Sequence, residues 1–142
     1  MSIKRMLVAV DGSEGSDRAL EMAAEIAQPN AETQVDLVYV VPVPPLEGDQ
    51  ELTFKTILDA MVKNGEELLE EAKEKVPAIA DRIEAKVIVG NSPAAEILNL
   101  IDERAYDLVV IGCRGLSGIK AYLGSVSHKV LNGSKVSVLI AK

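Results

Sequence analysis

The chain has 142 residues, 48% of them hydrophobic, and a formal net charge of −7; this is the size and composition of one globular domain. The negative charge argues against nonspecific binding to nucleic acid or to an anionic membrane surface. The single cysteine, Cys113, excludes an internal disulfide and suits a cytoplasmic protein. No apolar run approaches the roughly 20 residues of a membrane-spanning helix, and the basic-to-apolar start of the chain is too short for a signal peptide.

The charge is unevenly distributed along the chain. Residues 112–142 carry five lysine and arginine residues and no acidic residue, so this segment is +5 and residues 1–111 are −12. The basic segment coincides with a glycine-rich stretch, which favours a small anion as a ligand. Basic residues on solvated helix faces would give the same asymmetry.

The first part of the chain is predicted to form a strand, a helix and a second strand. Residues 3–10 end in an apolar, β-branched run, and residues 14–27 place alanine and leucine at helical spacing. Between them, residues 11–13 (DGS) punctuate the chain, with Ser13 as the helix N-cap. Residues 35–41 are nearly all apolar, which predicts a strand that is buried on both faces.

The middle of the chain is predicted to form a helix, a strand and another helix. After a proline-rich loop at residues 42–50, residues 51–76 carry an apolar stripe opposite an acidic face. Residues 84–89 read as the third strand. Ser92 is expected to cap a helix over residues 93–104, which has proline at its first position.

The last part is predicted to form a strand, a glycine loop, a helix and a final strand. Residues 107–111 form the fourth strand and lead directly into the loop at residues 112–124 (GCRGLSGIKAYLG). A helix over residues 125–131 is expected to end at the Asn-Gly pair of residues 132–133, as a C-cap. Residues 136–141 form the fifth strand.

This alternation of strands and helices predicts a single-domain α/β fold. Its sheet has five parallel strands and is open, with helices on both faces. Ligands of such sheets bind beyond the carboxyl ends of the strands, where the winding direction reverses. The turn at Asp11 follows the first strand and the loop from Gly112 follows the fourth, so the two segments meet if these strands are neighbours.

The glycine loop contains the groups that a phosphate site requires. Gly112 and Gly115 would let the backbone approach a ligand closely. Gly124 and Ser125 open a helix whose free N–H groups favour an anion, and Ser125 and Ser127 carry hydroxyl donors. The loop is neither a P-loop nor a GxGxxG motif, and a purely structural role explains its glycines equally well.

Four stretches of the sequence, in this order, resemble the universal stress protein family: MLVAVDGSEGSDRAL, GNSPAAEIL, DLVVIGCRG and GSVSHKVL. The resemblance covers the whole chain. The ATP-binding branch of that family has the pattern Gly, two residues, Gly, nine residues, Gly-Ser/Thr. Gly112, Gly115, Gly124 and Ser125 match its fixed positions, but eight residues separate Gly115 from Gly124, one fewer than in the pattern. The expected fold is Rossmann-like, with strand order 3-2-1-4-5.

The resemblance implies ATP as the ligand, with Mg²⁺ or Mn²⁺ neutralising the triphosphate. Asp11 would lie at the base and ribose or bridge to the metal ion, although an aspartate before a glycine also forms turns. Val40 would flank the adenine together with Ala9 and Val10.

The same resemblance assigns the glycine loop to the sugar and the phosphates. Gly112 and Gly115 would face ribose and phosphate, and Arg114 would steer phosphate unless it is simply an exposed loop residue. The groups expected on the phosphates come from Gly124, Ser125, Val126 and Ser127.

The sequence predicts an ATP-binding regulatory protein that acts as a homodimer through its last strand, Val136 to Ala141. The resemblance implies this dimer, and an apolar strand at a sheet edge invites pairing with a second copy. We expect no enzyme activity beyond slow ATP hydrolysis, since no general base, Walker lysine or arginine finger is apparent. Two alternatives stay open: a dimeric interaction module without nucleotide, and an enzyme, for which 142 residues leave little room.

Overall fold

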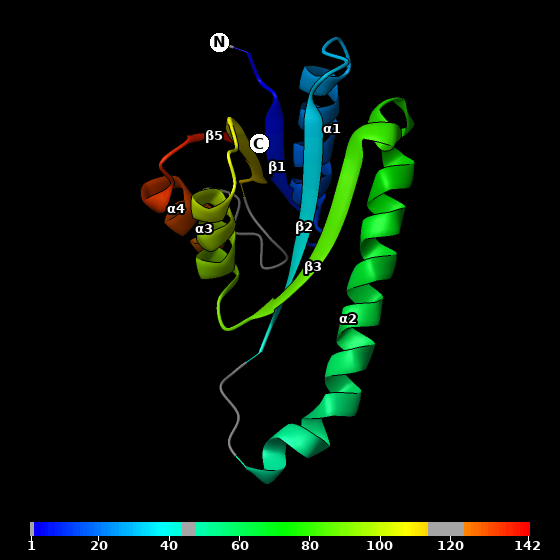
Figure 1. Ribbon diagram of the computed structural model, residues 1–142, viewed down its shortest axis with the longest axis vertical. Coiled ribbons are helices and arrows are strands. Elements are labelled where there is room, and N and C mark those ends of the chain that lie inside the picture. Colours follow the sequence, from blue (N-terminus) through cyan, green and yellow to red (C-terminus); the bar gives the residue numbers. More distant parts are fainter. Residues whose placement is uncertain (1, 44–47, 114–123) are drawn as a thin grey trace.

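A computed structural model describes residues 2–43, 48–113 and 124–142 of the chain. They form one sheet of five parallel strands in the order β3-β2-β1-β4-β5, which confirms the predicted fold (Figure 1). The elements in chain order are β1 (Arg5–Ala9), α1 (Glu14–Ala27), β2 (Gln34–Pro42), α2 (Asp49–Lys75), the 3₁₀ helix η1 (Pro77–Arg82), β3 (Ile83–Gly90), α3 (Pro93–Glu103), β4 (Leu108–Gly112), α4 (Ser125–Gly133) and β5 (Ser137–Ala141).

Helices cover both faces of the sheet. On one face α1 and α2 pack against the strands, and on the other α3 and α4 do so (Figure 1). The core therefore has two layers, in which Leu20 of α1 and Leu69 of α2 lie in one and Ile97 of α3 and Val130 of α4 lie in the other. All five residues of β4 are buried, as its unbroken apolar sequence requires.

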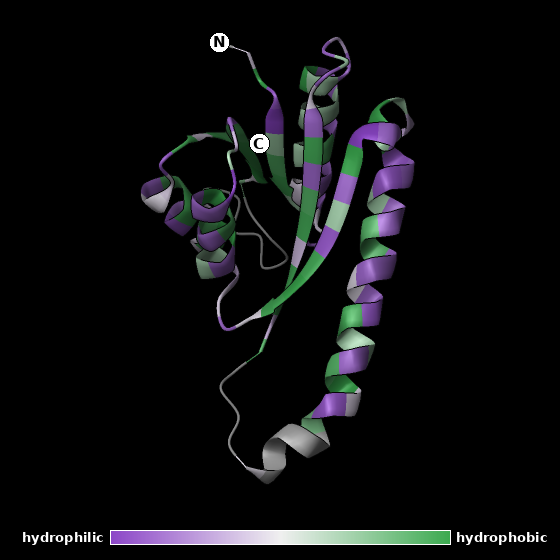
Figure 2. Ribbon diagram, in the orientation of Figure 1, coloured by the Kyte–Doolittle hydropathy of each residue, from purple (hydrophilic) through white to green (hydrophobic). Residues whose placement is uncertain are grey.

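The long helix α2 follows the sheet edge beside β2 and β3. Hydrophobic and hydrophilic residues alternate along it turn by turn (Figure 2), which is the pattern of a helix that is buried on one side only. Among the described residues, no helix is sufficiently long and apolar to cross a membrane.

The helix starts follow the sequence more closely than the helix ends. The Ser13 and Ser92 hydroxyls accept N–H groups of α1 and α3, at 3.1 and 3.4 Å, so both predicted N-caps are confirmed. The predicted C-cap of α4 is wrong: the helix includes Gly133, and Ser134 is its C-cap. Gly133 instead permits close helix packing, because a Cβ there would lie 2.8 Å from Leu98 Cδ1 of α3.

The winding direction of the sheet reverses between β1 and β4. These strands are neighbours, with Met6 opposite Leu108 and Val8 opposite Val110. The carboxyl ends of both strands therefore open into the same crevice, which is the predicted location of a ligand site.

Candidate functional site

A pocket of about 200 Å³ lies at this crevice. Arg114 and Gly115 lie outside the described residues. The other nine residues that the sequence singled out all line the pocket: Ala9, Val10, Asp11, Val40, Gly112, Gly124, Ser125, Val126 and Ser127.

The pocket also contains residues that sequence reasoning missed. Ser16 lines it from α1, and Ile111 lines it from β4. Pro93 and Ile97 line it from α3, one helical turn apart. Their spacing marks one helix face in the sequence, but periodicity alone cannot say which cavity that face borders.

The Asp11 carboxylate is held by the turn that follows β1. Its Oδ1 accepts the N–H of Ser13 at 2.9 Å. Gly12 makes this possible with a φ of +83°, in the left-handed region that favours glycine. The turn thus places one acidic side chain in the pocket, directly before α1 begins.

Gly112 serves the packing of α1 against β4. A Cβ at this position would lie 2.5 Å from the carbonyl carbon of Gly15, in the first turn of α1. The two backbones therefore touch where a side chain would separate them. The result is that the start of α1 borders the pocket, with Ser13 and Ser16 among its lining residues.

The start of α4 presents backbone donors to the pocket. The N–H of Gly124 donates to the Cys113 carbonyl at 2.7 Å, and no side chain of the described residues caps the helix. The N–H groups of Ser125, Val126 and Ser127 belong to the first turn, so the helix itself supplies no acceptor for them. A helix start of this kind favours an anion.

The two serine hydroxyls of α4 differ in availability. Ser127 is buried, and its hydroxyl donates to the Gly112 carbonyl at 2.6 Å. Its single hydrogen is therefore already used, unlike in the sequence-based prediction, which gave both serines as free donors. The Ser125 side chain has more exposure and lines the pocket.

The β2 strand offers an open backbone edge to the same pocket. The last bond between β1 and β2 runs from the Val10 N–H to the Val38 carbonyl, yet β2 continues to Pro42 beside β3. Successive residues of a strand direct their backbone groups to opposite sides. Val40 therefore directs its N–H and C=O toward the side that β1 has left.

The described residues include no group of three or more histidine, cysteine, aspartate or glutamate side chains that could hold a metal ion. Asp11 is the acidic side chain that lines the pocket. Metal binding through Asp11 stays a prediction.

A model described as the universal stress protein family matches residues 2–142. The chain belongs to the universal stress protein family. Universal stress protein YxiE of Bacillus subtilis (strain 168) is 38% identical over 148 residues, which cover 97% of this chain and 98% of YxiE.

Solved structures of universal stress proteins share this architecture. UspA from Lactobacillus plantarum matches with a TM-score of 0.87 over 100% of this chain and 99% of that protein, at 21% identity, which shows a common fold. A universal stress protein in complex with cAMP matches with a TM-score of 0.71 at 28% identity, over 100% of this chain and 98% of that protein.

Proposed function

We propose that the pocket binds an adenine nucleotide, ATP with Mg²⁺ or Mn²⁺ in particular. The observation that carries this proposal is the set of N–H groups at the start of α4, for which the described residues supply no side-chain cap and which border the same pocket as the backbone edge of β2. The relative that was solved with cAMP supports a nucleotide as the ligand class.

The base is expected to lie against Val40. The N–H and C=O of Val40 form a donor and an acceptor side by side, and the Watson–Crick edge of adenine offers an acceptor and an amino donor. Apolar side chains of Ala9, Pro93 and Ile97 line the pocket and suit the faces of a purine ring.

The phosphate groups are expected at the start of α4. The N–H groups of Ser125, Val126 and Ser127 and the Ser125 hydroxyl would donate to phosphate oxygens. A triphosphate would share this pocket with the carboxylate of Asp11, and the two would repel each other. Mg²⁺ or Mn²⁺ would supply the positive charge that offsets this repulsion.

We further propose a regulatory role without efficient catalysis. Among the described pocket residues none is a histidine, lysine or glutamate, and the one carboxylate, Asp11, is assigned in this proposal to the base, the ribose or the metal ion rather than to proton transfer. Hydrolysis, if it occurs, is expected to be slow. A bound nucleotide would then act by changing the contacts of the protein rather than by turnover.

The protein is proposed to act as a homodimer through the segment Val136 to Ala141, which is β5 and the residue that precedes it. This strand forms one edge of the sheet, and Val138 and Ile140 are only partly buried. The Ala141 carbonyl accepts the N–H of Cys113, the residue after β4, so the alternating residues Ile140 and Val138 direct their N–H and C=O groups outward. An edge of this kind can pair with a second copy.

Calorimetric titration of ATP with Mg²⁺ tests the nucleotide site, after any co-purified small molecule has been released by denaturation and identified by mass spectrometry. We expect micromolar or tighter binding. Ser125→Ala is expected to weaken it, and Ser134→Ala, at the opposite end of α4, serves as the matched control. AMP and cAMP titrations rank the ligands.

No co-purified nucleotide and no binding heat up to millimolar ATP, AMP or cAMP would contradict the proposal. The shorter spacing between Gly115 and Gly124 and the occupied Ser127 hydroxyl would then explain the loss. The protein would act instead as a dimeric interaction module.

Light scattering coupled to gel filtration tests the dimer. Val138→Pro removes an outward N–H but keeps the ladder to β4, so it should yield a folded monomer. Val89→Pro, near the end of the opposite edge strand β3, is the control and should remain dimeric. A wild-type monomer at micromolar concentration would overturn this part of the proposal.

A further inference from the structure

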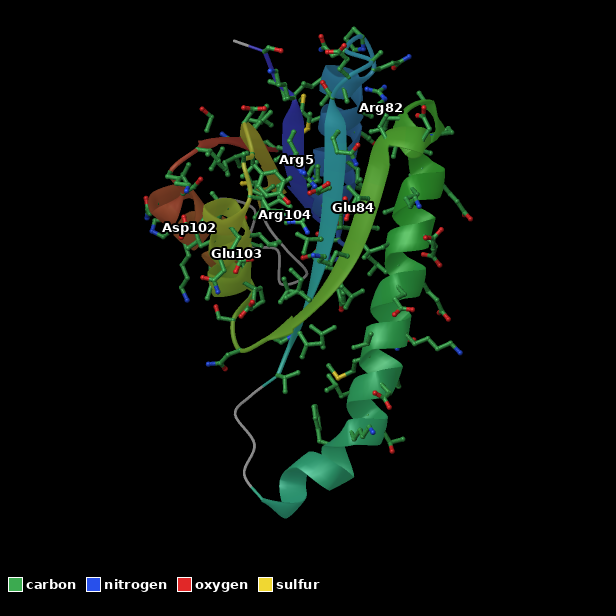
Figure 3. The ribbon with its side chains drawn as sticks, viewed as in Figure 1. Arg5, Arg82, Glu84, Asp102, Glu103 and Arg104 are labelled. Carbon is green, nitrogen blue, oxygen red and sulfur yellow. The ribbon has the colours of Figure 1, made fainter. Side chains whose placement is uncertain are left out.

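A cluster of polar side chains lies at the amino ends of the strands, away from the pocket. Asp36 of β2 is at its centre, with a side chain that is only 7% exposed. Arg5 comes from β1, Arg104 from the residue after α3, and Tyr106 from the segment before β4. Figure 3 shows Arg5, Arg104 and Glu84 gathered over this part of the sheet.

All of these contacts converge on one oxygen atom of Asp36. Its Oδ2 accepts the Tyr106 hydroxyl at 2.7 Å and the Arg5 guanidinium at 2.9 and 3.0 Å, and lies 3.4 Å from Arg104. Its Oδ1 is also buried, but no protein group among the described residues donates to it. A buried carboxylate oxygen without a donor is rare in proteins, so it needs an explanation.

The structure provides a space of matching size at this position. A cavity of about 10 Å³ is lined by Asp36, Glu84, Lys86, Arg104 and Tyr106 together with apolar side chains. A volume of roughly 10–15 Å³ is what one water molecule needs, together with two to four polar partners.

We propose that this small hollow, which is partly open to solvent, binds a single ordered water molecule that donates a hydrogen bond to the buried Asp36 Oδ1. Its second hydrogen can go to the Tyr106 or Glu84 oxygen, and its lone pairs can accept from the Arg104 guanidinium or the Lys86 ammonium. The site thus requires a small neutral donor that is also an acceptor.

Two other occupants fit the cavity less well. A metal cation would lie beside two guanidinium groups that already share the Asp36 carboxylate, and their positive charges oppose it. The Lys86 ammonium could reach Oδ1, but Lys86 is exposed and makes no ion pair with Asp36 at 4.0 Å or less. A water molecule avoids both objections.

A crystal structure at about 1.5 Å resolution, from crystals grown without ammonium salts, tests the proposal. We expect one ordered water oxygen at hydrogen-bond distance, roughly 2.7–3.2 Å, from Asp36 Oδ1. Lys86→Met should retain this water, since the ammonium is not its essential partner. An absent peak, or Lys86 Nζ bonded to Oδ1, would overturn the proposal.

Nuclear Overhauser effects between water and backbone amides provide the solution test. The wild-type protein should show a long-lived water contact at the amides of Leu37 and Val38. The double variant Asp36→Leu with Tyr106→Phe replaces the polar pair by apolar groups and should lose the contact. Asp107→Asn, a carboxylate at the same end of the sheet but outside the cavity, should retain it. An unchanged contact in the double variant would contradict the proposal, and the crystallographic test stands if that variant does not fold.

Discussion

The two ends of the sheet place an aspartate in opposite environments. At the carboxyl end, Asp11 is held by one backbone N–H and faces a pocket of about 200 Å³. At the amino end, Asp36 is buried, and Arg5, Arg104 and Tyr106 converge on it. The comparison shows that polar groups at the carboxyl end border an open pocket, where we propose a ligand, whereas the protein itself supplies most of the partners of Asp36 at the amino end.

The backbone shows the same contrast. At the carboxyl end β1 stops while β2 continues, so among the described residues Val40 has no strand partner on that side and α4 begins without a side-chain cap. At the amino end Asp107 accepts the N–H groups of Lys4 and Arg5 at 2.8 and 3.0 Å. Substitutions at the two ends should therefore separate stability from binding.

Asp36→Ala is expected to have the largest effect on stability. It leaves two guanidinium groups and a buried phenol without their shared acceptor, and breaking a buried ion pair costs about 3–5 kcal/mol. Urea denaturation measures the loss, while ATP affinity should change little. Glu84→Ala, which removes an exposed contact to Arg5, should cost no more than about 1 kcal/mol. A similar small loss for both variants would contradict the comparison.

Tyr106→Phe is expected to cost about 1.5–3 kcal/mol, the usual value for a hydrogen bond to a charged group. It should also change the alkaline limb of stability. Burial, together with the hydrogen bond to Asp36 and its charge, raises the pKa of Tyr106 above the usual value of 10.0. Because the pKa is raised in the folded state, Tyr106 adds to the free energy of unfolding below its unfolded pKa of about 10. This contribution is lost as the pH rises above that value. Unfolding measured from pH 8 to 12 should therefore slope less in Tyr106→Phe than in the wild type; equal slopes would contradict this.

Asp11→Asn is expected to change binding rather than stability. It keeps an oxygen for the Ser13 N–H but removes the charge from the pocket, and an affinity change of about tenfold corresponds to roughly 1.4 kcal/mol. Metal-dependent ATP binding should weaken if Asp11 contacts the metal ion, as calorimetry with and without Mg²⁺ will show. The matched control is Asp102→Asn on α3, where the carboxylate is exposed. Equal ATP affinities of Asp11→Asn and the wild type would show that the Asp11 charge does not contribute to binding.

Asp107→Asn should have the smallest effect, a loss of stability that is present at neutral pH and disappears in acid, where the wild-type carboxylate is protonated. The N–H groups of Lys4 and Arg5 lower the pKa of Asp107. A lowered pKa gives stability that is present above the unfolded value of about 4 and is lost as the pH falls through the folded value. Acid denaturation between pH 5 and 2 should therefore be shallower in the variant. If the plot of stability against pH for the variant ran parallel to that of the wild type, the hydrogen bonds of Asp107 to Lys4 and Arg5 would contribute nothing to stability.

Local patterns in the sequence determined much of this protein. The apolar runs predicted five strands, and helical spacing with Ser13 and Ser92 as caps located the starts of α1 and α3. The glycines and serines after the first and fourth strands marked where the pocket lies. These features depend on residues near each other in the chain, so periodicity and capping reveal them.

Only the tertiary structure decided which distant groups meet. Asp36 reads in the sequence as one position of an apolar strand, yet its partners Arg5, Arg104 and Tyr106 lie 31, 68 and 70 residues away. Likewise, the backbone edge of Val40 faces the side that β1 has left because β1 ends early, and Gly133 lies inside α4 at a position where a Cβ would clash with Leu98. Such contacts depend on which strands pair and where each one ends, and no local pattern records either.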